Sequence, residues 1–170
     1  IALTQTSYKI YAALLQRRLQ VGLEARIRPH QYGFRPHKST SQPVHIIRRI
    51  LELYERQGET LHLLFLDWAK AFDTISHEAI ECCLHRIGVP EPMVKAVCAL
   101  YVLPTFQIRD LYSTSEPQPQ GRGVRQGCPL FPYLFIAVLT IVMHDVDQEV
   151  LQTHGTLPWV FSAASPMWDM

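Results

Sequence analysis

The residues best suited to chemistry lie in and just after one apolar run of this 170-residue sequence. Leu63 to Leu66 form an apolar segment that predicts a buried strand, and Asp67 follows at its end. A carboxylate held rigidly at the tip of a strand suits a hard divalent cation such as Mg²⁺, which prefers oxygen ligands. The alternative is a buried strand that simply ends on a turn-forming aspartate.

A second segment, residues 121–135, carries groups that suit a nucleotide. It begins as a glycine-rich turn with Arg125 and Gln126, and Gly127 lets a ligand approach the backbone closely. An apolar helix follows from about Pro132, and its first turn offers unpaired N–H groups. The glycines are spaced one residue wider than the dinucleotide-binding fingerprint, and no buried strand precedes them, so we discount that site.

A third segment, residues 31–40, lies upstream and predicts a rigid loop. Arg35 and Lys38 stand in it just before the start of a helix, an arrangement that suits a phosphate group. The guanidinium of Arg35 can contact phosphate through two hydrogen bonds, and Lys38 can act as a point charge. The alternative for Lys38 is an exposed loop lysine.

In this order, the three segments resemble the reverse transcriptase domain of non-LTR (LINE-type) retrotransposons and the related group II intron enzymes. Residues 31–40 look like the fingers loop, residues 64–73 like the first palm motif and residues 123–135 like the second. Residues 1–19 look like the segment that opens such domains. The resemblance implies an RNA-directed DNA polymerase that uses Mg²⁺, an RNA template, a DNA primer and dNTPs.

The resemblance also implies roles for single residues. Asp67 is expected to be catalytic and to bind both metal ions of a two-ion site, with the backbone carbonyl of Trp68 as a further ligand. Phe72 falls at the steric gate, the aromatic ring beneath the sugar of a dNTP, although plain core packing is the alternative. The residues expected at the nucleotide are Arg35, Lys38, Phe72, Gln126 and Gly127, and those on the template side are Gly123, Arg125 and Pro129.

Two departures from the family pattern matter. The third palm motif, Tyr-x-Asp-Asp on a hairpin, is absent, since Asp145 and Asp147 are not adjacent and are expected at the end of a helix. Phe131 stands where the family has a small hydroxyl residue, so a bulky ring is expected to crowd the template side. We therefore expect a truncated or degenerate reverse transcriptase domain that does not polymerise by itself.

Two other functions remain open. One is a non-catalytic remnant that binds RNA. Residues 1–56 contain ten Lys or Arg against three Glu, whereas residues 57–170 contain six against twelve Asp or Glu. Cations that hold phosphates and carboxylates that hold metals fit this asymmetry, although chance clustering on solvated helices is the alternative. The other is an unrelated metal-dependent hydrolase that uses Asp67 and Asp73.

Cysteine usage and hydropathy bear on location. Cys82, Cys83, Cys98 and Cys128 form no Cys-x-x-Cys pair, so we interpret them as reduced thiols of an intracellular protein, nuclear or cytoplasmic. The longest apolar run, residues 130–143, is too short to span a bilayer, so no membrane partner is expected. The sequence does not define the oligomeric state.

Periodicity predicts mostly helices and few strands. A strand is expected at Leu61–Leu66, a hairpin-like stretch at 105–120, and a short strand at Leu157–Ala163 that covers the edge of the first. The helices are expected from a Thr4 or Thr6 cap to about Gly22, from Thr40 or Ser41 to Gly58, from Ser76 to Ile87, from Pro90 or Pro92 to about Leu103, and from about Pro132 to His144.

These elements predict the α+β class. The resemblance refines this to an incomplete right-hand polymerase fold, with fingers plus a partial palm and a small antiparallel sheet packed on helices. A single incomplete domain is expected. Residues 1–60 would be fingers-like, residues 61–150 a partial palm and residues 151–170 a divergent tail.

Overall fold

The computed structural model describes residues 5–125 and 127–155. This part of the chain combines helices with one small antiparallel sheet, which is compatible with the α+β class. The elements are α1 (Thr6–Leu23), α2 (Ser41–Gln57), α3 (Ala71–Thr74), α4 (His77–Arg86), α5 (Glu91–Cys98), the 3-10 helix η1 (Ala99–Tyr101), β1 (Thr105–Phe106), β2 (Gln118–Pro119) and α6 (Phe131–His154).

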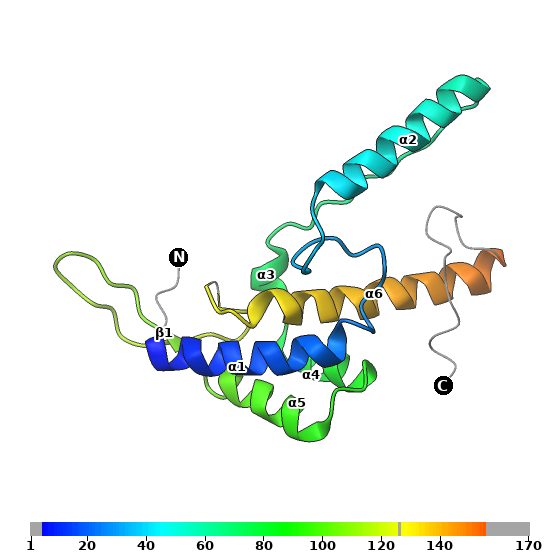
Figure 1. The fold of residues 1–170 in the computed structure, drawn as a ribbon. Helices are drawn as coiled ribbons and strands as arrows, with labels where there is room; N and C mark the ends of the chain where they lie inside the picture. Colours follow the sequence, from blue (N-terminus) through cyan, green and yellow to red (C-terminus); the bar gives the residue numbers. More distant parts are fainter. Residues whose placement is uncertain (1–4, 126, 156–170) are drawn as a thin grey trace.

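Four helices make the body of the molecule. Figure 1 shows α1 and α6 side by side, with α4 and α5 packed beneath them. Apolar side chains from all four helices and from the residues before α6 close the core, because burying them removes apolar surface from water. The largest fully buried side chains are Leu23, Ile80, Leu84, Leu130, Leu134, Ile136, Val94 and Val97.

Periodicity predicts an apolar face of α1 at Tyr8, Tyr11, Leu15 and Leu19, and the structure confirms it only in part. Leu15 and Leu19 are buried and Tyr8 packs against the core, but the side chain of Tyr11 is 44% exposed. Thr6 lies inside the helix, whose N-cap is Gln5, so the Thr6 cap was wrong. The alternative cap, Thr4, lies outside the described residues.

Helix α2 forms where it is predicted, but the buried stripe that periodicity predicts at Val44, Ile47, Leu51 and Tyr54 is wrong. Gly58 ends the helix in a left-handed conformation, with φ +69°, a geometry that glycine adopts without steric cost. No residue of α2 is buried, and Val44 and Leu51 of the predicted stripe are 49% and 45% exposed. Figure 1 shows α2 extending away from the four-helix body, so that body does not cover the apolar stripe.

The predicted strand at Leu61–Leu66 is also wrong. These residues form no strand, and the side chains of Leu64 and Phe65 are 83% and 75% exposed. A strand needs a hydrogen-bonded neighbour, and no described segment pairs with this one. The proposed covering strand, Leu157–Ala163, lies outside the described residues.

Helix α4 begins and ends close to the residues that the sequence predicts. The side chain of Ser76 caps the helix by accepting a hydrogen bond from the backbone N–H of Ala79 at 3.1 Å. Gly88, with φ +80°, follows its end as predicted. The predicted helix after Pro90 is found as α5 followed by η1, which ends at Tyr101.

Helix α6 continues ten residues beyond the predicted end at His144. Asp145 and Asp147 therefore lie within the helix and not at its end. Asp145 forms a two-point ion pair with Arg86 of α4, one arm of which measures 2.7 Å, and Asp147 pairs with Arg28 after α1. These ion pairs anchor the distal half of α6 to the body.

The predicted hairpin is confirmed as a projecting arm. Strands β1 and β2 pair antiparallel, with Thr105 opposite Pro119 and Phe106 opposite Gln118. A further bridge joins Arg109 to Thr114. The arm extends from the body beside the start of α1 (Figure 1). Within the described ranges, no helix has both the length and the apolar character needed to cross a lipid bilayer.

Candidate functional site

The three chemically interesting segments of the sequence meet at one aromatic ring. Phe72 on α3 lies edge to face with Phe131 and Phe135 at the start of α6, with ring centroids 4.7 and 4.8 Å apart. Phe34, from the loop before α2, approaches the same ring at 6.5 Å. Such edge-to-face pairs stabilise an aromatic cluster beyond simple burial. The side chain of Phe72 is nevertheless 38% exposed, so one part of the ring faces solvent.

Backbone hydrogen bonds join the glycine-rich loop to the segment after Asp67. The N–H of Val124 donates to the carbonyl of Phe72 at 3.1 Å, and the N–H of Gly123 donates to the carbonyl of Ile75 at 2.8 Å. A Cβ at Gly123 would lie 3.0 Å from the Cα of Asp73, and Gly123 has φ +81°. Only glycine satisfies both conditions without strain. Gly123 is thus required for the close approach of the two segments.

The carbonyl of Gly123 is held by two side chains that the sequence did not single out. The Nε2 of His77 lies 3.0 Å from this oxygen, and the amide nitrogen of Gln120 donates to it at 3.4 Å. A carbonyl oxygen only accepts, so His77 carries a proton on Nε2. The His77 ring also lies against Tyr101, with centroids 4.8 Å apart and planes inclined by 34°. His77 lies 46 residues from Gly123, so no local spacing in the sequence could reveal this contact.

Tyr8 is a further residue whose role in the site the sequence did not reveal. Its O–H donates to the Sγ of Cys128 at 3.3 Å, and the guanidinium of Arg125 lies over its ring, 4.9 Å from the centroid. Burial raises the pKa of the Tyr8 hydroxyl above its ordinary value, so the group stays protonated and donates. Tyr8 thereby fixes the predicted template-side residue Arg125 to α1. Gln126 lies outside the described residues.

The remaining predicted residues of this loop are placed as follows. Gly127 has φ +88°, a left-handed conformation that favours glycine. Pro129 lies in the half-buried turn that leads into α6. Both positions flank Cys128, whose backbone N–H donates to the carbonyl of Arg125 at 3.0 Å, so the loop is a closed turn.

The guanidinium of Arg35 is hydrogen-bonded to residues between α1 and the start of the loop. Its guanidinium binds the carboxylate of Glu24 at 2.9 and 2.6 Å and the carbonyls of Arg28 and Gln31 at 2.9 and 3.2 Å. Four of its five N–H groups are therefore used to hold the loop together, and the side chain is 9% exposed. The structure gives Arg35 a role in shaping the loop, and nucleotide contact by this residue stays a prediction.

Lys38 is half-buried. Its ammonium lies 5.2 Å from the centroid of the Tyr32 ring, a cation–π contact within the loop. The structure gives this ammonium an aromatic neighbour, and phosphate contact by Lys38 stays a prediction.

Asp67 and Trp68 follow the unpaired run directly, and both are exposed. The carbonyl of Trp68 accepts a hydrogen bond from the N–H of Ala71 at 3.3 Å and keeps one lone pair for a ligand. The described residues include no group of three or more His, Cys, Asp or Glu side chains that could hold a metal ion. One carboxylate does not make a two-ion site, so these residues alone do not fit a pair of metal ions. The alternative of a hydrolase site formed by Asp67 with Asp73 stays a prediction.

A hollow of about 580 Å³ borders Trp68. Its lining comes from the residues around α3, from the start of α4, from Gly121 and Arg122, and from the middle of α6. The lining is mostly apolar, with Glu78 and Arg122 as its charged members. It lies on the side of α3 where Phe135 also reaches Phe72.

Comparison with known proteins gives a consistent result. The family model described as "Reverse transcriptase (RNA-dependent DNA polymerase)" matches residues 1–159. The chain is 33% identical over 135 residues to "Transposon TX1 uncharacterized 149 kDa protein" of Xenopus laevis, covering 79% of this chain and 10% of that protein. It is 30% identical over 122 residues to "Retrovirus-related Pol polyprotein from type-2 retrotransposable element R2DM" of Drosophila melanogaster, covering 72% and 12%.

A third relative, also from Drosophila melanogaster, is "Probable RNA-directed DNA polymerase from transposon BS". It is 30% identical over 138 residues, covering 79% of this chain and 15% of the relative. The chain therefore spans no more than 15% of the length of these three relatives.

Proposed function

The chain belongs to the reverse transcriptase (RNA-dependent DNA polymerase) family, and from that premise we propose that it forms the nucleotide- and template-facing part of an RNA-directed DNA polymerase of retrotransposon origin. In the complete enzyme the partners are an RNA template, a DNA primer and dNTPs. The chain supplies the fingers loop, the Asp67 segment and the glycine-rich loop.

The observation that carries this proposal is the meeting of the three segments at Phe72. Phe34, Phe131 and Phe135 reach its ring, and the backbone of Val124 is bonded to its carbonyl. Segments separated by tens of residues are brought to one place, as a shared substrate requires. The exposed part of the Phe72 ring is where the sugar of a deoxynucleotide would rest.

The family uses divalent metal ions, and the proposal assigns Mg²⁺ to Asp67 and the carbonyl of Trp68. Two such ions clamp the attacking and leaving oxygens in nucleotidyl transfer, and holding them takes several carboxylates. Among the described residues, no group of three or more His, Cys, Asp or Glu side chains could hold a metal ion. We therefore expect this chain to bind substrates weakly and not to extend a primer by itself.

The test is a primer-extension assay with the purified chain, Mg²⁺, a primed RNA template and dNTPs, beside an equilibrium measurement of dNTP binding. The expected result is no extension, with Mg²⁺-dependent dNTP binding that Asp67→Ala weakens and Asp73→Ala leaves unchanged. Extension that disappears in Asp67→Ala would show that the chain is a complete catalyst. Binding that ignores both Mg²⁺ and Asp67 would remove the proposed role of the carboxylate.

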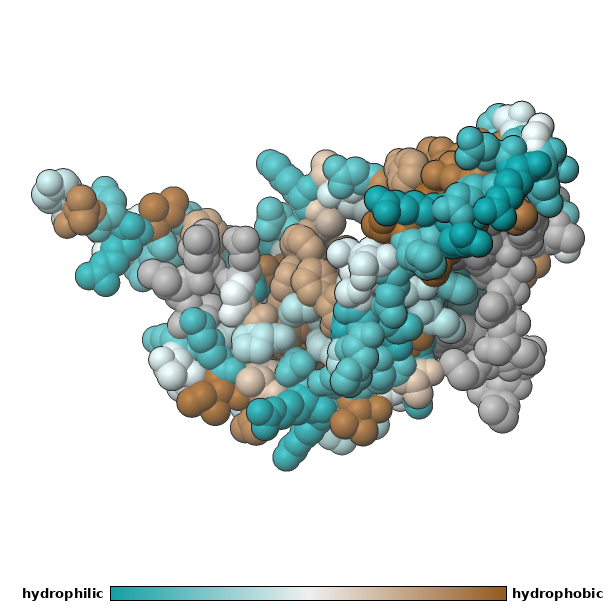
Figure 2. All heavy atoms as spheres, turned by 45° about the horizontal axis from the view of Figure 1, so that its top comes forward, coloured by the Kyte–Doolittle hydropathy of each residue, from teal (hydrophilic) through white to brown (hydrophobic). Residues whose placement is uncertain are grey.

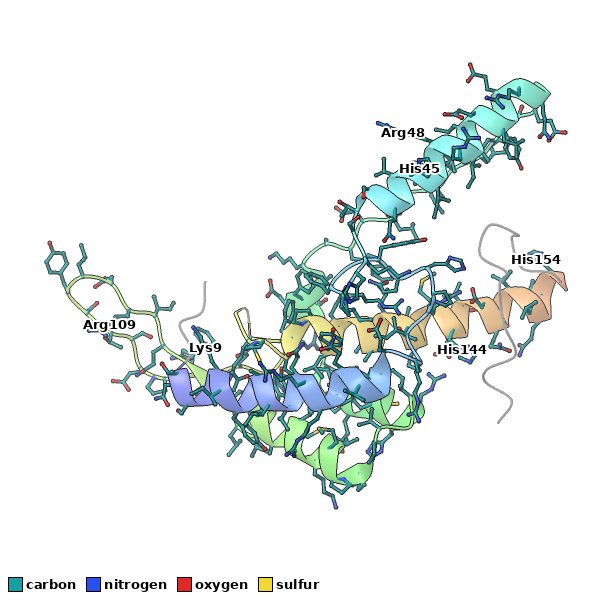
Figure 3. The ribbon with its side chains drawn as sticks, in the orientation of Figure 1. Lys9, His45, Arg48, Arg109, His144 and His154 are labelled. Atoms are coloured by element: carbon teal, nitrogen blue, oxygen red, sulfur yellow. The ribbon has the colours of Figure 1, made fainter. Side chains whose placement is uncertain are left out.

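A non-catalytic RNA-binding remnant is the second candidate, and the basic first third of the chain favours it. His45 and Arg48 lie on the projecting helix α2, as Figure 3 shows, and both are exposed. Such a remnant would bind RNA with an affinity that falls steeply with salt and does not depend on Mg²⁺. The same titrations, repeated from 50 to about 200 mM salt with and without Mg²⁺, separate the two candidates.

A further inference from the structure

One edge of the projecting arm is unpaired and chemically open. Inside the arm, the N–H of Ser115 donates to the carbonyl of Ile108 at 2.8 Å, and the N–H of Asp110 donates to the carbonyl of Ser113 at 3.0 Å. Backbone groups point alternately to the two sides of a strand in an antiparallel pair. The groups of Gln107, between the inward-facing residues, therefore point to the outer edge, as do those of Thr105 and Arg109.

The opposite edge of the arm is blocked by prolines. The N–H of Gln120 donates to the carbonyl of Pro104 at 2.7 Å, so residue 120 faces inward and Pro119 faces outward. Proline has no N–H, and a second proline, Pro117, lies just before β2. Prolines on an edge strand prevent a further strand from pairing there. Strand addition is therefore possible on the β1 edge and hindered on the β2 edge.

Hydrogen bonds within the arm hold its tip. The Oδ1 atom of Asp110 accepts hydrogen bonds from the backbone N–H groups of Tyr112 at 2.8 Å and Ser113 at 2.7 Å. This side-chain turn fixes the tip with Leu111 and Tyr112 pointing outward, 92% and 95% exposed. The tip of the arm is therefore already ordered in the free chain, so pairing loses less conformational entropy there.

We propose that two copies of the chain associate by antiparallel pairing of their β1 edges, with the two-fold axis at Gln107. In this register Phe106 lies opposite Ile108 of the second copy, and Thr105 lies opposite Arg109. An aromatic side chain facing a β-branched one is a favourable cross-strand pair, and no like charges meet. The two arms form one four-stranded sheet.

In the same two-fold arrangement, the second copy covers the most exposed apolar residues in and near the arm. Because the arms run antiparallel, the tip of each lies beside the base of the other. Leu111 and Tyr112 at one tip then lie next to Val102 and Leu103 of the second copy, which are 70% and 89% exposed. Exposed apolar side chains are visible along the arm in Figure 2. Large apolar side chains that are exposed in one copy and covered in a pair are typical of association sites.

The charge of the arm argues against nucleic acid as the occupant. Arg109 is its only cation, and Asp110 and Glu116 lie beside it. Figure 3 shows Arg109 partway along the arm. Single-stranded nucleic acid selects a positively charged track with several cations. A second copy of the same edge can pair with the outward N–H and C=O groups and also cover the exposed apolar side chains. The dimer does not depend on the polymerase activity proposed above.

Sedimentation of the 170-residue chain over a wide concentration range tests the dimer. The expected result is a shift from 19.6 kDa toward twice this mass as the concentration rises. Gln107→Pro removes an outward N–H of β1 and should weaken the association at least tenfold. Thr114→Pro removes an outward N–H on the blocked edge and should leave it unchanged. Far-UV circular dichroism checks that both variants keep the helical body.

Cross-linking provides an independent measurement. In a background with Cys82→Ser and Cys98→Ser, Gln107→Cys should form a disulfide-linked dimer under mild oxidation, because paired strands bring these Cα atoms to about 5.5 Å. Glu116→Cys, equally exposed on the other strand, should not. A chain that stays at 19.6 kDa, association that Gln107→Pro leaves intact, or cross-linking at Glu116→Cys would each overturn the proposal.

Discussion

The rings of Phe131 and Phe72 lie edge to face, with centroids 4.7 Å apart and planes inclined by 69°. Phe131 begins α6 and Phe72 belongs to α3, so this contact joins the second palm-like segment to the first. It also gives Phe131 a definite structural place. The ring of Phe131 packs on Phe72, the ring assigned to the sugar of the nucleotide, and crowding of the template side stays a prediction.

A smaller side chain at position 131 should therefore lower the free energy of unfolding and expose more of the Phe72 ring. Phe131→Ser removes a half-buried ring, and we expect the free energy of unfolding to fall by about 1–3 kcal/mol, less than for a fully buried phenylalanine. Mg²⁺-dependent dNTP binding should tighten, because more of Phe72 becomes accessible. Urea unfolding and dNTP titration measure the two effects. Phe65→Ser, at a side chain that is 75% exposed, is the control and should change neither.

Local parts of the fold could be predicted from the sequence because the signals act over a few residues. Ser76 caps α4 through an N–H three residues away, and Gly58 and Gly88 end helices by their own conformations. Burial could not be predicted in the same way. The stripe on α2 and the apolar run before Asp67 define faces that could be buried, but a packing partner depends on tertiary contacts.

In the candidate site, too, local features could be predicted from the sequence and tertiary contacts could not. The three segments were identified from their residue types, and the structure brings Phe34, Phe72 and Phe131 together. Tyr8 and His77 escaped notice because their bonded partners lie 120 and 46 residues away. The residue types of Tyr8 and His77 alone gave no reason to choose them. Their roles follow only from the packing of α1 and α4 beside the glycine-rich loop.

The contacts of Tyr8 can be separated by two substitutions. Tyr8→Phe removes the hydrogen bond to Cys128 but keeps the ring beneath Arg125, and should cost about 0.5–1.5 kcal/mol of unfolding free energy. Tyr8→Leu also removes the cation–π contact and should cost roughly 0.5–1 kcal/mol more. Tyr11→Phe, on the same helix but 44% exposed, should have no effect. Equal losses for Tyr8→Phe and Tyr8→Leu would show that Arg125 gains nothing from the ring.

The ion pair between Asp145 and Arg86 makes a small pH-dependent contribution to stability. The hydrogen bonds from Arg86 hold the pKa of Asp145 below its ordinary value of 3.8. A carboxyl with a lowered pKa in the folded state stabilises the protein above about pH 4, and the contribution is lost as the pH falls through the folded-state pKa. The pair is half exposed, so its contribution should not exceed about 1 kcal/mol.

Unfolding free energies of the wild type and Asp145→Asn, measured from pH 2 to about pH 7, test this sign. The difference between them should be constant near neutral pH and shrink below about pH 4. Glu149→Gln, an exposed change on the same helix, should give no pH-dependent difference. A difference that grows toward acid pH would contradict the lowered pKa.

Gly123 offers the sharpest test of how the two palm-like segments are joined. Gly123→Ala places a Cβ 3.0 Å from the backbone of Asp73 and requires φ +81° of a residue with a side chain. Strain and crowding together should cost about 2 kcal/mol or more, because backbone atoms cannot rotate out of the way as a side chain can. Gly121→Ala, two residues earlier, meets no atom within 4 Å and is the matched control.

Gly123→Ala should also change the backbone hydrogen bonds next to residue 123. If the loop moves to admit the methyl group, the bond from Val124 to the carbonyl of Phe72 lengthens, and its amide exchanges faster with solvent. Hydrogen exchange of the Val124 amide should therefore accelerate in Gly123→Ala and not in Gly121→Ala. Unchanged stability and exchange in Gly123→Ala would mean that the close approach of the loop to α3 is not maintained in solution, and that Phe72 is held by its aromatic neighbours alone.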